Sequence, residues 1–94
     1  MQTWPDGRKY SGHFKDSFFE GHGAFFWPDG AKYLGQFSNG KASGEGVHFY
    51  PKGEKFVGQW QNGMKNGLGV YFSSEGDIIA EGRWRDDKYI GPEQ

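Results

Sequence analysis

Histidine is the residue type of this chain best suited to metal or acid–base chemistry, and three are present, at His13, His22 and His48. In the strand register developed below, His13 and His22 lie across one hairpin from each other. No third ligand is evident beside them, whereas a structural zinc site needs four ligands. His48 takes the place that Phe25 and Tyr71 hold elsewhere in the chain, so packing explains it. We predict no metal site.

The carboxylates and the paired glycines do not combine into a catalytic motif. Asp6, Asp29 and Glu75 recur at one turn position, which is typical of turn chemistry and not of an acid–base pair. The Gly-x-Gly pairs recur with the same spacing and do not open a helix. The sequence contains neither a phosphate-binding loop nor a Gly-x-Ser-x-Gly elbow. We therefore predict a non-enzymatic protein without catalytic residues or a cofactor.

Lysine recurs every 23 residues, at Lys9, Lys32 and Lys55. A basic residue near an anionic leaflet contributes about 1 kcal/mol, so this row could bind lipid weakly. Acidic residues such as Asp29 and Glu54 lie near it, and the formal net charge of the chain is −1. We interpret the row first as a solvated face, and as a lipid-binding surface in the alternative. The same charge balance predicts no binding of nucleic acid.

Aromatic residues are the strongest candidates for binding, since the chain holds four Trp, five Tyr and nine Phe. Tryptophan and tyrosine are favoured hot-spot residues at protein interfaces. A single-layer sheet has no second layer to bury its rings, and exposed apolar surface marks interaction sites. We predict that these residues line a groove for a protein partner or a second copy of the chain. The predicted partner-binding residues are Tyr10, Phe14, Tyr33, Phe37, His48, Phe56, Trp60, Tyr71 and Trp84.

The overall composition indicates one small domain of unusual make-up. Glycine accounts for 17 of 94 residues, and cysteine is absent, so disulfides and thiolate zinc sites are excluded. The sequence contains no apolar run long enough to span a membrane and no apolar core of a signal peptide. We expect a cytoplasmic protein, with peripheral membrane or cytoskeletal association as the alternative.

Glycine marks a repeat of 23 residues, as Gly12, Gly35 and Gly58 show. Such a period is typical of repeat architectures, in which each unit stacks on its neighbours. Within one repeat, residues 32–37 and 44–50 read as strands, joined through an Asn-Gly turn. The sequence therefore predicts an all-β fold, an elongated single-layer antiparallel meander of about seven strands.

The turns also predict a register. A three-residue loop at Pro51-Lys52-Gly53 pairs His48 with Phe56, Gly46 with Gly58 and Gly44 with Trp60. A longer loop around Asn39-Gly40 pairs Gly35 with Gly46 and Phe37 with Gly44. One face then carries a central row of glycines, over which the flanking rings lie. The opposite face carries an aliphatic stripe and the lysine row, and there Phe26, Phe49 and Phe72 alternate with the lysines.

These motifs match a known family. Tyr33-Leu34-Gly35-Gln36-Phe37 followed by Gly44-Glu45-Gly46, with an Asn-Gly turn between them and a closing Pro-x-Gly, resembles the MORN repeat (membrane occupation and recognition nexus). The resemblance covers nearly the whole chain. It implies an elongated, twisted sheet of stacked hairpins, with roles in scaffolding, dimerisation and docking of partner proteins. The family's name records a proposed membrane role, and its repeats are not enzymes, although some are joined to enzyme domains.

We expect residues 1–94 to form a single array. Residues 1–9 are a partial repeat, residues 10–32, 33–55 and 56–79 are repeats, and residues 80–94 are a degenerate C-terminal cap. Because the array begins in mid-repeat, either the gene starts there or the chain is a piece of a longer array. Three functions stay open: a scaffolding module that binds a protein or itself, a weak module for anionic membranes, and a regulatory segment of a larger multidomain enzyme.

Overall fold

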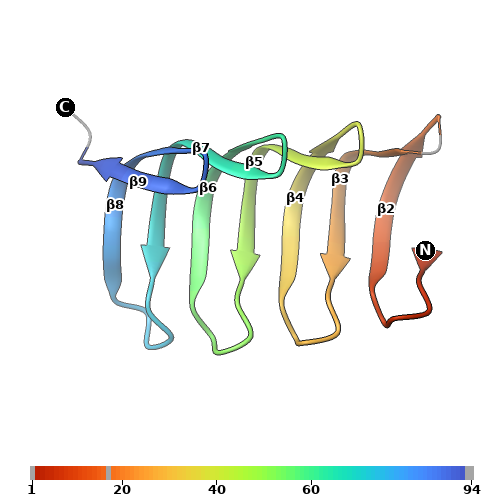
Figure 1. Ribbon diagram of the computed structural model, residues 1–94, viewed down its shortest axis with the longest axis horizontal. Helices are drawn as coiled ribbons and strands as arrows, with labels where there is room; N and C mark the ends of the chain where they lie inside the picture. The colour runs from red at the N-terminus through yellow and green to blue at the C-terminus, as the bar shows by residue number, and fades with distance from the viewer. Residues whose placement is uncertain (1, 17, 93–94) are drawn as a thin grey trace.

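The computed structural model describes residues 2–16 and 18–92, and these residues form one antiparallel sheet of nine strands. The strands follow one another in chain order, so each pairs with its neighbours in sequence (Figure 1). The strands are β1 (Gln2–Thr3), β2 (Lys9–Lys15), β3 (Phe18–Phe26), β4 (Lys32–Ser38), β5 (Lys41–Phe49), β6 (Lys55–Gln61), β7 (Met64–Phe72), β8 (Ile78–Arg85) and β9 (Lys88–Gly91). The predicted all-β, single-layer meander is confirmed. Residue 1 and residues 93–94, the outer ends of the predicted segments 1–9 and 80–94, lie outside the described residues.

The predicted number of about seven strands is too low, because each end of the sheet carries one more. At the N-terminal end Gln2 pairs with Tyr10, which makes β1. At the C-terminal end Asp86 and Asp87 adopt positive φ angles of 49° and 71°, and β9 folds back onto β8. Aspartate tolerates this left-handed conformation, so the hairpin forms without a glycine.

The hairpins with the Pro-x-Gly signature have the predicted geometry. In the hairpin that joins β3 to β4, the N–H of Trp27 donates to the carbonyl of Ala31 at 3.0 Å, and the N–H of Gly30 donates to the carbonyl of Trp27 at 3.1 Å. This is a three-residue loop with glycine at positive φ. The pairings expected across the equivalent loop of the next repeat are confirmed, including His48 with Phe56.

The hairpins with the Asn-Gly signature are tighter than predicted. Phe37 pairs with Ala42 and not with Gly44, and Asn39 and Gly40 form a two-residue turn with φ angles of 52° and 83°. The register is recovered through a bulge opposite Gln36. There Gly44 has a φ of 89°, and the Gln36 Oε1 accepts a hydrogen bond from the N–H of Glu45 at 2.8 Å. Because β5 begins at Lys41, the side chain of Ala42 stands on the aromatic face.

The core lies on one face, which we call the aromatic face after the rings that it carries. The buried aromatic residues are Tyr10, Phe25, Tyr33, Phe37, Phe56, Trp60 and Trp84. The ring of Tyr33 covers Gly46, so closely that a Cβ on Gly46 would meet Tyr33 atoms first. The Tyr33 hydroxyl donates to the carbonyl of Gln36 at 3.0 Å, and the Trp60 Nε1 donates to the carbonyl of Gly46 at 3.2 Å. The predicted packing of rings on bare backbone is confirmed.

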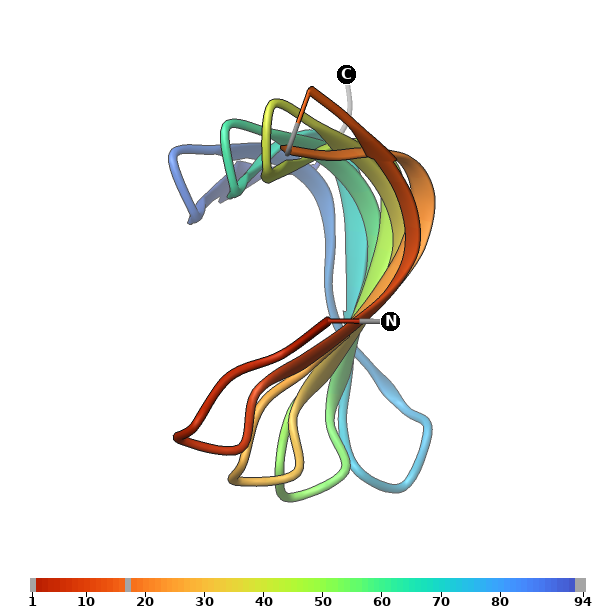
Figure 2. The same cartoon turned by 90° about the vertical axis from the view of Figure 1, so that its right-hand side faces the viewer.

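The repeats are joined through an edge-to-face chain of rings along the sheet. The Tyr33 ring centroid lies 5.1 Å from that of Phe37 and 5.3 Å from that of Trp60, with interplanar angles of 83° and 82°. Trp60 continues the chain to Phe56 at 5.3 Å and 89°. The sheet is curved when seen along its long axis (Figure 2), and its extents are 39 × 26 × 16 Å. The result is an elongated curved sheet whose only substantial core among the described residues is this chain of rings.

Candidate functional site

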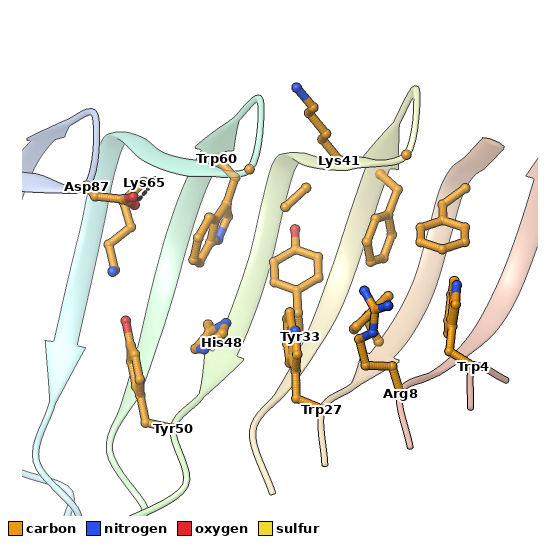
Figure 3. A pocket seen from close by; sticks show the side chains of 16 residues that line it. Trp4, Arg8, Trp27, Tyr33, Lys41, His48, Tyr50, Trp60, Lys65 and Asp87 are labelled. Carbon is orange, nitrogen blue, oxygen red and sulfur yellow. Dashed lines mark hydrogen bonds between the residues drawn. The ribbon is translucent and has the colours of Figure 1, made fainter. Parts of the chain in front are cut away.

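The buried rings of the second and third repeats form the floor of a groove on the aromatic face. Tyr33, Phe37 and Trp60 line it and are 2, 7 and 7% exposed. The groove has a volume of about 660 Å³, which lies in the range of small-molecule sites in proteins. Residues from both ends of the hairpins line it (Figure 3), so the curved sheet wraps around the groove.

The first wall comes from the residues that precede the Pro-x-Gly turns. Trp4, Trp27 and Tyr50 occupy equivalent places 23 residues apart, and all three line the groove. The ring centroid of His48 lies 5.3 Å from that of Trp27 and 4.5 Å from that of Tyr50, so the wall is continuous. The predicted partner-binding residues do not include these three, although their recurrence every 23 residues was the signal that could have identified them.

The second wall comes from Phe19, Ala42 and Lys65, again 23 residues apart, of which Ala42 and Lys65 follow the Asn-Gly turns. Their carbonyls are held by the tip of the next hairpin. The Gly63 N–H donates to the carbonyl of Ala42 at 2.9 Å, and the Asp87 N–H donates to the carbonyl of Lys65 at 3.1 Å. These bonds fix the spacing of the three side chains along the wall.

The charged residues that line the groove are mostly basic: Arg8, Lys41, Lys65 and Asp87. Arg8 forms an ion pair with Asp6 at 2.8 Å, the one ion pair among residues 2–16 and 18–92. Lys41 points away from the groove at its rim, whereas the ammonium group of Lys65 points into it (Figure 3). The Asp87 carboxylate accepts a hydrogen bond from the Lys65 backbone N–H at 2.8 Å. The groove is therefore mainly apolar, and Lys65 is an inward-pointing cation for which the described residues provide no ion pair.

Aromatic rings surround the Lys65 ammonium group. Its Nζ lies 5.5 Å from the ring centroid of Tyr50, 5.4 Å from that of Phe56 and 5.7 Å from that of Trp60. A cation over a ring face within about 6 Å is attracted by the ring quadrupole. These contacts hold the side chain over the core and keep the positive charge beside the groove.

His48 is the titratable residue at the centre of the groove. Burial lowers the pKa of its imidazole below the ordinary value of 6.5, and the positive charge of Lys65 lowers the pKa further. Asp29 and Asp87 act in the opposite direction. The ring is therefore neutral at pH 7 and acts there as a packing residue between Trp27 and Tyr50.

The structure separates the predicted partner-binding residues into groups. Tyr33, Phe37, His48 and Trp60 line the groove. The other predicted residues lie beside it: Tyr10, Phe56 and Trp84 in the buried core, Phe14 exposed at 42%, and Tyr71 half-buried against Tyr50. Contact of any of these residues with a partner stays a prediction.

The lysine row lies outside the groove, on the opposite face. Lys9, Lys32 and Lys55 pair across the strands with phenylalanines. The Lys32 Nζ lies 4.9 Å from the ring centroid of Phe49, and Lys55 makes the same contact with Phe72 at 5.1 Å. The predicted alternation of cation and ring is confirmed, and a role in lipid binding stays a prediction.

Neither a metal-binding cluster nor a membrane-spanning helix occurs in the described part of the chain. No group of three or more His, Cys, Asp or Glu side chains there is arranged to hold a metal ion. None of those residues forms a helix that is long and apolar enough to cross a membrane.

Comparison with known proteins identifies the repeats. A search of curated proteins finds no match to this chain. The family model of the MORN repeat matches three consecutive segments, residues 10–32, 33–55 and 56–78, which together make up most of the chain. These segments contain most of the rings and glycines described above and both kinds of hairpin. The chain therefore belongs to the MORN repeat family.

Proposed function

We propose that this chain is a non-catalytic interaction module that binds a protein partner in the groove between Trp27 and Trp60. MORN repeats are generally modules for interaction with proteins or membranes, and they are typically not catalytic. The observation that carries the proposal is the groove itself, because an aromatic hollow of about 660 Å³ on a small protein is surface available for a partner. Tryptophan and tyrosine on its walls are the residue types that dominate binding energy at interfaces.

Blocking the groove without disturbing the fold tests this proposal. Phe19 shows that a ring fits at the position equivalent to Ala42, since it stacks on Tyr10 with centroids 3.9 Å apart. Ala42→Phe should therefore fill the groove and leave the melting temperature nearly unchanged. Peptides selected from a random phage-displayed library against the native chain should bind the variant at least about tenfold more weakly.

The matched control is Val57→Phe, which adds a ring on the opposite face. It should bind the selected peptides as the native chain does. Selected peptides that bind the native chain and Ala42→Phe equally, or the absence of any enriched peptide, would contradict the proposal. Sedimentation equilibrium of the same proteins tests whether a second copy occupies the groove, because self-association through it should disappear in Ala42→Phe and persist in Val57→Phe.

Weak association with anionic membranes is the second candidate function. The observation that favours it is the alignment of Lys9, Lys32 and Lys55 on one face, away from the groove. The triple variant with glutamine at these positions should lose any binding to phosphatidylserine vesicles and keep peptide binding in the groove. Equal vesicle binding by the native chain and the triple variant would exclude the lysine row as a lipid site.

A further inference from the structure

The three equivalent positions of the second wall are filled differently. Phe19 stacks on Tyr10 with an interplanar angle of 7°, and Lys65 lies 5.4 Å from the ring centroid of Phe56. Between them Ala42 contributes only a methyl group beside Tyr33. The place that a ring or a long side chain fills in the neighbouring repeats is therefore open at Ala42, and the groove extends over it.

The open place at Ala42 has apolar surroundings. Tyr33, Phe37 and Trp60 line the same groove, and each is at most 7% exposed. Two neighbouring polar groups already form hydrogen bonds, since the Tyr33 hydroxyl donates to the carbonyl of Gln36 and the Trp60 Nε1 donates to the carbonyl of Gly46. Neither of these two side chains has a donor left for a polar ligand group. The site at Ala42 therefore suits one large apolar side chain of a partner.

One repeat further along the wall, the ammonium group of Lys65 points into the groove (Figure 3). Its neighbours are rings, and among the described residues no carboxylate lies within ion-pair distance of it. Asp87, the one acidic residue among the described residues that lines the groove, already accepts a hydrogen bond from the Lys65 backbone. Charge complementarity therefore favours an acidic partner side chain at Lys65.

The distance between the open place at Ala42 and the Lys65 side chain determines which partner conformation can contact both. Ala42 and Lys65 lie at equivalent positions of neighbouring repeats, two strands apart, and two strand spacings amount to about 9.6 Å. In an α-helix, residues seven positions apart lie on the same face and about 10.5 Å apart along the axis. In an extended peptide the matching separation is about three residues, whose side chains point to opposite faces. A helix thus reaches both places from one face.

We propose that the groove binds an amphipathic helix that runs across the strands, with a large apolar residue over Ala42 and an acidic residue seven positions away at Lys65. This inference rests on the proposed function and adds the chemistry and the register of the partner. The open place at Ala42 is the pocket for the large apolar residue, and Lys65 attracts the acidic residue of the partner.

The test uses designed helical peptides of about 18 residues, which span about 27 Å. The first carries one phenylalanine and one glutamate seven positions apart on a leucine-lined face, with glutamine and alanine elsewhere. The second has the same composition, but its glutamate is moved two positions further, to the opposite face of the helix. A third replaces the phenylalanine with alanine. Binding to the native chain, Lys65→Met and Ala42→Phe is measured by isothermal titration calorimetry and NMR.

The first peptide should bind the native chain about tenfold more tightly than the second, and the third should also lose about tenfold. The advantage of the first peptide over the second should vanish in Lys65→Met, a variant that keeps a side chain of similar length over the rings. Ala42→Phe should bind the first peptide more weakly than the native chain does. In this variant the first and third peptides should bind with equal affinity, because the phenylalanine of the first peptide has no pocket to enter.

Equal affinity of the first two peptides for the native chain, or an unchanged advantage in Lys65→Met, would overturn the assignment of Lys65. Failure of all three peptides to bind would overturn the helical register. These failures are distinct from failure of the proposed function, because phage-selected peptides that lose binding in Ala42→Phe would still show that the groove binds a partner of other chemistry.

Discussion

The two faces of the sheet have the same backbone but very different surroundings. On the aromatic face, Tyr33 and Phe56 are 2% and 0% exposed, although no second layer covers them. On the opposite face, the neighbouring residues Leu34 and Val57 are 39% and 38% exposed. That face has its own smaller hollow of about 480 Å³, but its aliphatic side chains remain largely in contact with water.

The difference teaches how a single layer can be stable. Rings that lie flat on glycine are buried by the backbone beneath them and by the neighbouring rings at the side, so they need no opposing layer. Valine and leucine on the other face have no such cover. We therefore expect stability to depend mainly on the aromatic face, so that matched substitutions on the two faces should differ in their cost.

The largest effect is expected for Phe56→Ala compared with Val57→Ala. Phe56 is fully buried, and truncation of a buried phenylalanine costs about 3–5 kcal/mol of unfolding free energy. Val57, the next residue, is partly exposed, and Val57→Ala should cost less than about 1 kcal/mol. Urea denaturation followed by tryptophan fluorescence measures both values. Similar losses at the two positions would show that the stability is shared between the faces.

A smaller loss, of about 1–3 kcal/mol, is expected for Gly46→Val, because the added side chain would displace the Tyr33 ring. Gly46 does not have a positive φ, so backbone strain does not contribute to this loss. In a Tyr33→Leu background the loss caused by Gly46→Val should shrink, and a double-mutant cycle measures the coupling. An unchanged melting temperature in the single variant would disprove the role of the ring over the glycine.

The sequence was sufficient to predict the glycine rows and the pairing at one end of each hairpin. The Pro-x-Gly loop has one common geometry, so Gly46 could be placed opposite Gly58. Across the Asn-Gly loop, the predicted pairing of Gly35 with Gly46 is confirmed and that of Phe37 with Gly44 is wrong. A two-residue turn followed by a bulge places the same residues on each face as a longer loop does, so the alternation of side chains did not distinguish the two. The recurrence of Gly44 and of Gln36 was the available signal, since the bulge needs a positive φ and the hydrogen bond from Glu45.

The groove could be predicted only in part. Its floor could be predicted because side chains alternate between the two faces along a strand, which places Tyr33 and Trp60 on one face. Its walls depend on the curvature of the sheet, which a pairing pattern does not contain, and so Trp27 and Tyr50 were not among the predicted groove residues. Ala42 was missed because it fell in the loop that was predicted too long.

His48 should make stability depend on pH. Its pKa is lowered in the folded chain, chiefly by burial, so the unfolded chain binds the proton more readily. The contribution of His48 to the unfolding free energy is therefore complete above its unfolded pKa of about 6.5. This contribution decreases as the pH falls toward the folded pKa. His48→Tyr, which has the residue found at position 71, should remove this part of the pH dependence. Denaturation midpoints between neutral and mildly acidic pH measure it, and identical profiles of native chain and variant would contradict it.

The smallest effect is expected for Lys32→Gln, and its comparison with Lys65→Gln contrasts the two faces a last time. The Lys32 Nζ contacts one ring, at 4.9 Å, on the face that is open to water, and such a contact contributes about 0.5–1 kcal/mol. Lys65 on the aromatic face lies near four rings, where a partly desolvated cation contributes up to about 2 kcal/mol. Urea denaturation should therefore show a larger loss for Lys65→Gln. A larger loss for Lys32→Gln would mean that the lysine row, and not the aromatic face, supplies the important cation contacts.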